Sequence, residues 1–172
     1  MEGLEGHLLH ARRSRRTNPP GLLTLSAGEV ADRLEIQHLI GRYADLIDGQ
    51  RFDELDELFT DDARIDFTTF GGPNGSLGEI KEFLAASLPL FARTQHMMGL
   101  PHITIDGDRA HARTSCNNPM LSTGRDGTTS VWLIGLWYVD ELTRTPAGWR
   151  FAARVQERCY TLTGLTDTPM QA

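Results

Sequence analysis

Residues 128–142 place the strongest constraint on the fold, because this stretch alternates like a β-strand and is nevertheless apolar on both faces. One face carries Trp132, Ile134, Leu136 and Tyr138, and the other carries Val131, Leu133, Trp137 and Val139. An antiparallel sheet commonly leaves one face in water, so a strand of this kind needs cover on both sides. We expect helices of the same chain to cover one face and a partner subunit to cover the other.

The segments around this strand indicate an α+β fold in a single domain. Two S-x-x-E sequences, at residues 26–29 and 76–79, have the form of capping boxes that open helices. Extended segments are predicted over residues 94–105, 109–121 and 149–161, separated by turn sequences. Helices followed by a run of long antiparallel strands are typical of the α+β class.

The composition fits a globular protein and excludes several functional classes. A length of 172 residues corresponds to one domain, and 40% hydrophobic residues suffice for a core. The net charge of −6 argues against nucleic-acid binding, and no run reaches the roughly 18 apolar residues that a membrane helix needs. Two cysteines, Cys116 and Cys159, without CxxC spacing, predict no disulfide framework and favour a reducing cytoplasm.

The charge is unevenly distributed along the chain and indicates its boundaries. Residues 1–25 hold four arginines against two glutamates, with no apolar period. We predict a flexible basic extension there, with a basic docking arm as the alternative. The folded domain is predicted over residues 26–163, and a frayed tail over residues 164–172.

Asp48 is the most informative candidate for chemistry. In an ideal helix whose apolar stripe is centred on Ile40, Asp48 falls about 80° from the centre, at the rim of the buried face. In the last helical turn the helix dipole disfavours a carboxylate, which should raise the basicity of Asp48 slightly. The alternative is an aspartate that points to water or caps the loop at Gly49.

His96 is the second candidate, on an extended segment where it shares a face with Thr94 and Met98. Imidazole titrates near about pH 6.5, so a carboxylate partner could make it a base at neutral pH. The alternative is a structural histidine. His102 shares its face but lies about 20 Å away along a strand, so the two cannot chelate one ion. With no H-E-x-x-H sequence or Cys/His cluster, we expect no protein-bound metal.

The order of these elements and several short sequences together resemble a known family. The sequences are IQHLIGRYADLIDG at residues 36–49, FDELDELFTDDA at 52–63, TQHMMG at 94–99, IDGDRA at 105–110 and GWRF at 148–151. Over about residues 28–163, the chain resembles SnoaL-like proteins of the nuclear transport factor 2-like superfamily.

The resemblance implies a cone-shaped α+β fold, in which helices pack into a strongly curved mixed or antiparallel sheet that encloses an apolar pocket. It also implies a small hydrophobic ligand and assembly as a homodimer or homotrimer. In pattern the chain is similar to bile-acid dehydratases, scytalone dehydratase and hexachlorocyclohexane dehydrochlorinase. These enzymes eliminate a small leaving group without an organic cofactor, so no cofactor is expected here.

Residue by residue, the resemblance implies a catalytic site. Asp48 matches the helix-end aspartate and His96 the strand histidine of an Asp–His dyad, and Tyr43 matches a pocket tyrosine of the bile-acid dehydratases. Arg158 matches a pocket arginine of that group. Simple alternation puts Arg158 on the face opposite Phe151, so it needs a β-bulge to enter the pocket.

Asn118 is a departure from the pattern of the bile-acid dehydratases, which have an acidic residue on this strand. An amide can donate or accept a hydrogen bond but cannot transfer a proton at neutral pH. Asn118 is therefore predicted to bind substrate, and the acid that would assist a leaving group stays unassigned.

These residues predict a lyase (dehydratase) or isomerase that acts on a hydrophobic ring-containing molecule such as a steroid or polyketide. His96, oriented by Asp48, would take a proton from carbon, while Tyr43 and Asn118 bind the developing oxyanion or departing hydroxyl. Arg158 would steady negative charge. The alternative is a non-catalytic pocket protein that binds a small ligand or stabilises a partner, because fold alone does not decide function. The small β subunit of a ring-hydroxylating dioxygenase is a less favoured third possibility.

Overall fold

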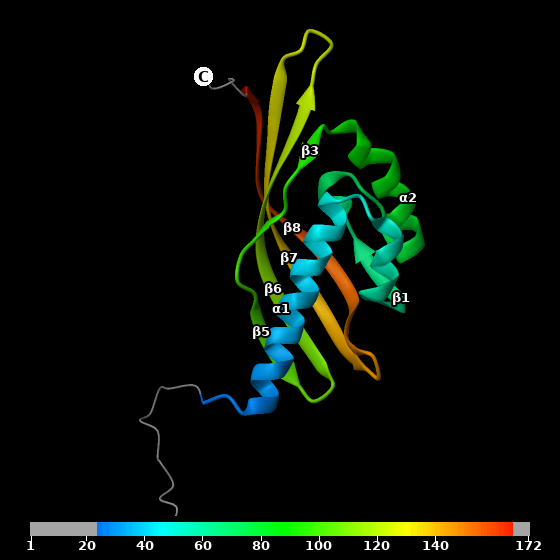
Figure 1. The fold of residues 1–172 in the computed structure, drawn as a ribbon, viewed down its shortest axis with the longest axis vertical. Helices are drawn as coiled ribbons and strands as arrows, with labels where there is room; N and C mark the ends of the chain where they lie inside the picture. Colours follow the sequence, from blue (N-terminus) through cyan, green and yellow to red (C-terminus); the bar gives the residue numbers. More distant parts are fainter. Residues whose placement is uncertain (1–23, 167–172) are drawn as a thin grey trace, which may run out of the picture.

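The computed structural model describes residues 24–166, which form helices packed against one face of a large curved sheet (Figure 1). The helical elements are α1 (Ala27–Asp48), η1 (Phe52–Glu57), η2 (Thr68–Phe70), α2 (Leu77–Ser87) and η3 (Leu88–Leu90). The strands are β1 (Phe59–Asp66), β2 (Asn74–Ser76), β3 (Arg93–Thr94), β4 (Met97–Met98), β5 (His102–Asp106), β6 (Arg109–Thr123), β7 (Thr129–Thr145) and β8 (Gly148–Thr166). The predicted α+β class is confirmed.

The sheet is mixed, in the order β2-β1-β8-β7-β6-β3, and β4 and β5 also pair with β6. β1 runs parallel to β8, and the other pairs are antiparallel. The three longest strands, β6, β7 and β8, lie side by side at its centre. Figure 1 shows α1 crossing one face of these strands, with α2 at the side of the sheet where β1 lies.

Both predicted capping boxes are present. Ser26 opens α1 by accepting a hydrogen bond from the Glu29 backbone N–H, while the Glu29 side chain accepts one from the Ser26 backbone. Ser76 and Glu79 do the same at α2. Each box satisfies backbone donors that a helix start otherwise leaves without partners.

Helix α1 buries one stripe of side chains in the core, as the sequence predicts. Its buried residues are Ile36, Leu39, Ile40, Tyr43, Ala44, Leu46 and Ile47. They pack with inward-facing residues of the sheet that include Ala112, Leu136 and Phe151. This packing fixes the last turn of α1, and therefore Asp48, against the sheet.

The boundaries of the described structure differ slightly from those predicted. The predicted extension over residues 1–25 lies almost wholly outside the described residues, as do residues 167–172 of the predicted tail. Residues 164–166 continue β8, because β7 is long enough to pair with Leu165 and Thr166. Among residues 24–166, no helix is both long and apolar enough to cross a membrane.

Candidate active site

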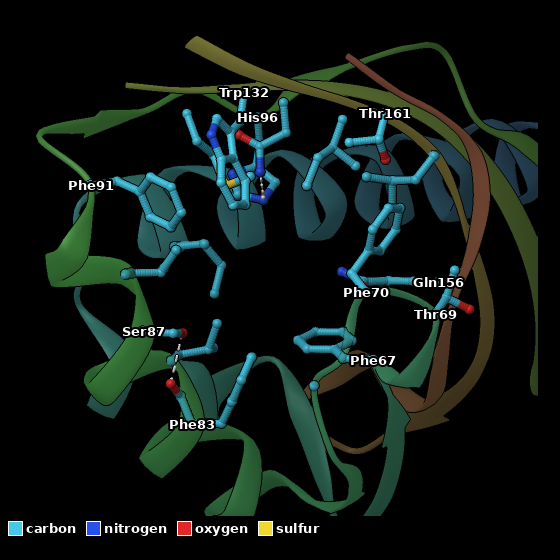
Figure 2. Close-up of a pocket in the computed structure, with 18 of the residues that line it drawn as sticks. Phe67, Thr69, Phe70, Phe83, Ser87, Phe91, His96, Trp132, Gln156 and Thr161 are labelled. Carbon is cyan, nitrogen blue, oxygen red and sulfur yellow. Dashed lines mark hydrogen bonds between the residues drawn. The ribbon is translucent and has the colours of Figure 1, made fainter. Parts of the chain in front are cut away.

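A cavity of about 610 Å³ lies between the helices and the sheet (Figure 2). Its walls are mostly apolar, and aromatic rings from four elements surround it: Phe67 and Phe70 near η2, Phe83 from α2, Phe91 after η3 and Trp132 from β7. A few polar side chains interrupt this lining, among them His96, Asn118, Gln156 and Arg158. A mostly apolar cavity with a few convergent polar groups is the usual form of a small-molecule site.

Asp48 and His96 form a hydrogen-bonded pair, and His96 lines the cavity. Asp48 is the last residue of α1, and His96 lies between β3 and β4. The His96 Nδ1 atom lies 2.7 Å from Asp48 Oδ1, and the His96 backbone N–H donates to Asp48 Oδ2 at 2.7 Å. The His96 side chain is only 6% exposed, and Asp48 holds its ring at Nδ1.

Thr94 is a third member of this group. The sequence predicts that Thr94 shares a face with His96 but assigns it no role. Its hydroxyl donates to Asp48 Oδ1 at 2.9 Å. The Asp48 carboxylate thus accepts three hydrogen bonds, two of them through Oδ1. Thr94 and His96 face the same way because they are two residues apart in an extended segment.

The carboxyl of Asp48 stays ionised in this setting. Burial works to raise its pKa, but hydrogen bonds and charge from His96, helped by the Thr94 hydroxyl, outweigh burial and lower the pKa below its usual value. The net direction is therefore opposite to the slight rise in basicity expected from the helix dipole alone. Direct hydrogen bonds to a carboxylate favour its charged form more strongly than the dipole of a helix end disfavours it.

Asn118 lies on the other side of the imidazole. It projects inward from β6, and its Nδ2 lies 3.2 Å from His96 Nε2. In a neutral imidazole whose Nδ1–H donates to Asp48, Nε2 carries the lone pair and accepts from the Asn118 amide. The structure therefore joins three of the five predicted residues, Asp48, His96 and Asn118, in one chain of hydrogen bonds.

Tyr43 lines the same cavity from α1, but its ring lies in an aromatic cluster. It makes edge contacts with Phe59, Tyr138 and Phe151, at centroid distances of 5.7–6.2 Å. Burial raises the pKa of Tyr43 although the nearby Arg154 charge opposes this. At neutral pH the Tyr43 hydroxyl therefore keeps its proton and can donate a hydrogen bond.

Beneath this cluster lies a buried ion pair that the sequence analysis missed. Arg154 Nε and Nη2 donate to the two carboxylate oxygens of Asp140 at 2.7 and 2.9 Å, and both side chains are fully buried. The Arg154 guanidinium also stacks on the rings of Tyr43 and Phe151, 3.9 and 4.1 Å from their centroids. Asp140 is directly opposite Arg154 in the pairing of β7 with β8. The sequence signal that could have found this ion pair is Asp140, a charged residue at an inward position of an alternating strand.

Arg158 lines the cavity, and a β-bulge brings it there, as its position required. The pairing of β7 with β8 shifts register where Leu142 faces Phe151 and Glu141 faces Ala153. One extra residue on β8 reverses the alternation, so Phe151 and Arg158 lie on the same face. Arg158 pairs with Leu136 of β7, and Leu136 pairs in turn with Cys116 of β6. The Cα atoms of Arg158 and Cys116 are therefore two strands, or about 10 Å, apart.

The described residues offer neither a cluster of metal-binding side chains nor an ionised thiol at this site. Within residues 24–166, no three His, Cys, Asp or Glu side chains are arranged to hold a metal ion. Cys116 is buried, and burial raises the pKa of its thiol to about 12, so it remains protonated. The expected absence of a cofactor stays a prediction.

Comparison with known proteins assigns the family. The model of the SnoaL-like domain matches residues 28–155. The chain is also 44% identical over 136 residues to the uncharacterized protein Rv2910c of Mycobacterium tuberculosis, which covers 79% of this chain and 91% of that protein. The chain belongs to the SnoaL-like family.

Solved structures share the fold of this SnoaL-like protein. The Kfla4162 protein of Kribbella flavida is 32% identical, with a TM-score of 0.70 over 77% of this chain and 94% of that one. A type 2 hexachlorocyclohexane dehydrochlorinase (LinA) has a TM-score of 0.71 over 83% of this chain and 97% of that one. Its identity of 18% makes it evidence for the fold alone.

Proposed function

We propose that this SnoaL-like protein is a cofactor-independent lyase (dehydratase) or isomerase that acts on a hydrophobic ring-containing small molecule. The observation that carries the proposal is the Asp48–His96 pair, with His96 in the wall of a mostly apolar cavity. The same fold occurs in a dehydrochlorinase, an enzyme named for an elimination, so the fold is compatible with this class of chemistry.

In the proposed mechanism, His96 Nε2 is the general base. It takes a proton from a carbon next to a carbonyl or a leaving group, and the electron pair of the broken C–H bond forms the new double bond. In an elimination the leaving group departs with its own bonding pair, whereas in an isomerisation the imidazolium returns the proton to another carbon. Asp48 holds the ring through Nδ1 and stabilises the imidazolium that forms.

Two further predicted residues fit supporting roles in this mechanism. Tyr43 is protonated and lines the cavity, so it can donate to an oxyanion that develops on the substrate. Arg158, which lines the cavity from β8, can attract negative charge on the substrate. Neither residue shares a hydrogen bond with the Asp48–His96 pair in the described structure, so their roles depend on how the substrate lies.

The proposal is tested by carbon–hydrogen exchange, which requires no knowledge of the leaving group. A panel of steroid and polyketide ring ketones is incubated with the protein in D₂O, and deuterium uptake and loss of water are followed by mass spectrometry. We expect His96→Ala to lower the rate of uptake by about 10²–10⁴-fold, because it removes the general base. His102→Ala is the matched control, since His102 is an exposed strand histidine outside the cavity. Equal rates in the wild type and His96→Ala would remove His96 from the mechanism.

The alternative function is non-catalytic binding of a small ligand, and Asn118 is the observation that favours it. Its amide occupies the lone pair of His96 Nε2, so the base is free only when that hydrogen bond opens. Saturable binding of panel members, with neither deuterium uptake nor loss of water for any of them, would support this alternative.

We further propose that the protein assembles as a homodimer or homotrimer in the cytoplasm. The outer face of β7 and β8, turned away from α1, carries partly exposed apolar side chains that include Val155, Leu162 and Leu165. A second copy would cover them. The cytoplasmic compartment is proposed because Cys116 and Cys159 are free thiols.

A further inference from the structure

Strand β8 presents a glutamine to the mostly apolar cavity. Gln156 lines this cavity and is partly exposed. Figure 2 shows Gln156 on the side of the cavity opposite Phe91 and Ser87. Moving an amide into apolar surroundings costs free energy unless its donors and acceptors find partners. A glutamine in this wall therefore requires hydrogen-bond partners.

The chain supplies one partner for this amide, and the contact is long. Gln156 Nε2 donates to the Tyr138 hydroxyl at 3.5 Å, and within residues 24–166 the Gln156 side chain makes no other hydrogen bond. An amide has two N–H donors and an oxygen that can accept two hydrogen bonds. One N–H and the oxygen of Gln156 thus have no partner in this part of the chain. The oxygen is not enclosed by protein, whereas the unpartnered Asn118 Oδ1 is.

The Gln156 amide lies away from His96 along the cavity wall. Asn118, which contacts His96, and Gln156 are two strands and four positions apart through β7. Their Cα atoms would be about 17 Å apart on a flat sheet, and are closer on a curved one. Leu136 of β7 lies between them and also lines the cavity. A ligand that reaches from His96 to Gln156 therefore crosses an apolar stretch of wall.

We propose that Gln156 is a specificity-determining residue, which binds a neutral oxygen group at the end of the ligand remote from His96. This inference deepens the proposed function and rests on it for the identity of the cavity as a ligand site. A hydroxyl on the ligand can donate to the amide oxygen, and a ketone can accept from the free N–H. The ligand class is thereby narrowed to hydrophobic ring systems that carry oxygen groups at both ends.

Three steroids that differ only at carbon 17 test this role without requiring turnover. Androst-4-en-3-one has no oxygen there, testosterone has a hydroxyl, and androst-4-ene-3,17-dione has a ketone. Binding is followed by tryptophan fluorescence, since Trp132 lines the cavity. We expect the wild type to bind testosterone or the dione about tenfold more tightly than androst-4-en-3-one, as one net hydrogen bond allows. In Gln156→Met, which keeps the length but has no amide, this preference should fall below about twofold.

Ser87→Ala is the matched control variant. The Ser87 hydroxyl also belongs to the cavity wall, but it already donates to the Phe83 backbone oxygen at 2.8 Å. This variant should therefore keep the wild-type preference. Gln156→Met should fold, because it gives up only the long contact with Tyr138, and a thermal melt checks this.

Three results would overturn this role: equal affinities for the three steroids in the wild type, no binding of any, or an undiminished preference in Gln156→Met. The last would place the oxygen on another group, such as Arg158, which also lines the cavity from β8. Deuterium uptake keeps this test separate from that of the proposed function. Uptake that depends on His96, with no preference at carbon 17, would remove the role of Gln156 and leave the mechanism. A preference at carbon 17 without uptake into any ring ketone would do the reverse.

Discussion

At the scale of single residues, Thr94 is the side chain whose role is most open to test. Its hydroxyl is one of three donors to Asp48, and the other two both come from His96. Thr94→Val keeps the shape and removes this donor. We expect a loss of about 1.5–3 kcal/mol in the free energy of unfolding, measured in urea, because the lost hydrogen bond serves a charged group.

Thr94 is also expected to be a positioning residue for catalysis. In the deuterium-uptake assay, Thr94→Val should be about tenfold slower, and Thr94→Ser, which restores the hydroxyl, should recover most of the rate. A purely structural role would give a different pattern, in which the valine variant is less stable but exchanges deuterium at the wild-type rate.

At the scale of elements, the end of α1 decides where Asp48 lies, and one residue there is strained. The helix closes with a Schellman motif, in which Gln50 N–H donates to Ile47 O and Arg51 N–H donates to Leu46 O. The left-handed residue of this motif is Gln50, with φ of 53°, whereas Gly49 has φ of −81°. A non-glycine side chain in this conformation costs roughly 1 kcal/mol.

Gln50→Gly should therefore raise the free energy of unfolding by about 0.5–1 kcal/mol, measured in urea. Gly49→Ala is the matched comparison, because its Cβ would lie 3.0 Å from Asp45 O and 3.1 Å from Arg51 Nε, and it should destabilise the protein. If Gln50→Gly lowered stability, the side chain of Gln50 would have to contribute more than its backbone strain costs.

The same elements show how far sequence reasoning reaches. Helical spacing placed Asp48 at the rim of the buried face, because the period of a helix is a local regularity of one element. The contact of Asp48 with His96 spans 48 positions in the chain and was supplied by family resemblance. The bulge that turns Arg158 inward was required by that resemblance but could not be located, since it depends on the pairing of β7 with β8.

At the scale of the whole molecule, the two faces of the central strands differ in what covers them. The face toward α1 carries the core and the cavity, whereas the outer face carries Val155, Tyr160, Leu162 and Leu165 at 37–49% exposure. Trp137, on the same outer face, is covered by Arg113, whose guanidinium lies 3.9 Å from the ring centroid. Strand β7, which is apolar on both faces, thus has one face buried by the chain itself and one face partly exposed to solvent.

A second copy of the chain is expected to cover this outer face, so a charge placed there should separate the copies. Leu162→Glu puts a carboxylate in the middle of the apolar patch, where association would strip its water. Sedimentation should show a dimer or trimer for the wild type and a monomer for Leu162→Glu. Leu34→Glu, which alters an exposed leucine of α1 on the other side of the sheet, should keep the wild-type mass. A monomeric wild type, or a Leu162→Glu variant with unchanged mass, would mean that this face is not the one through which copies associate.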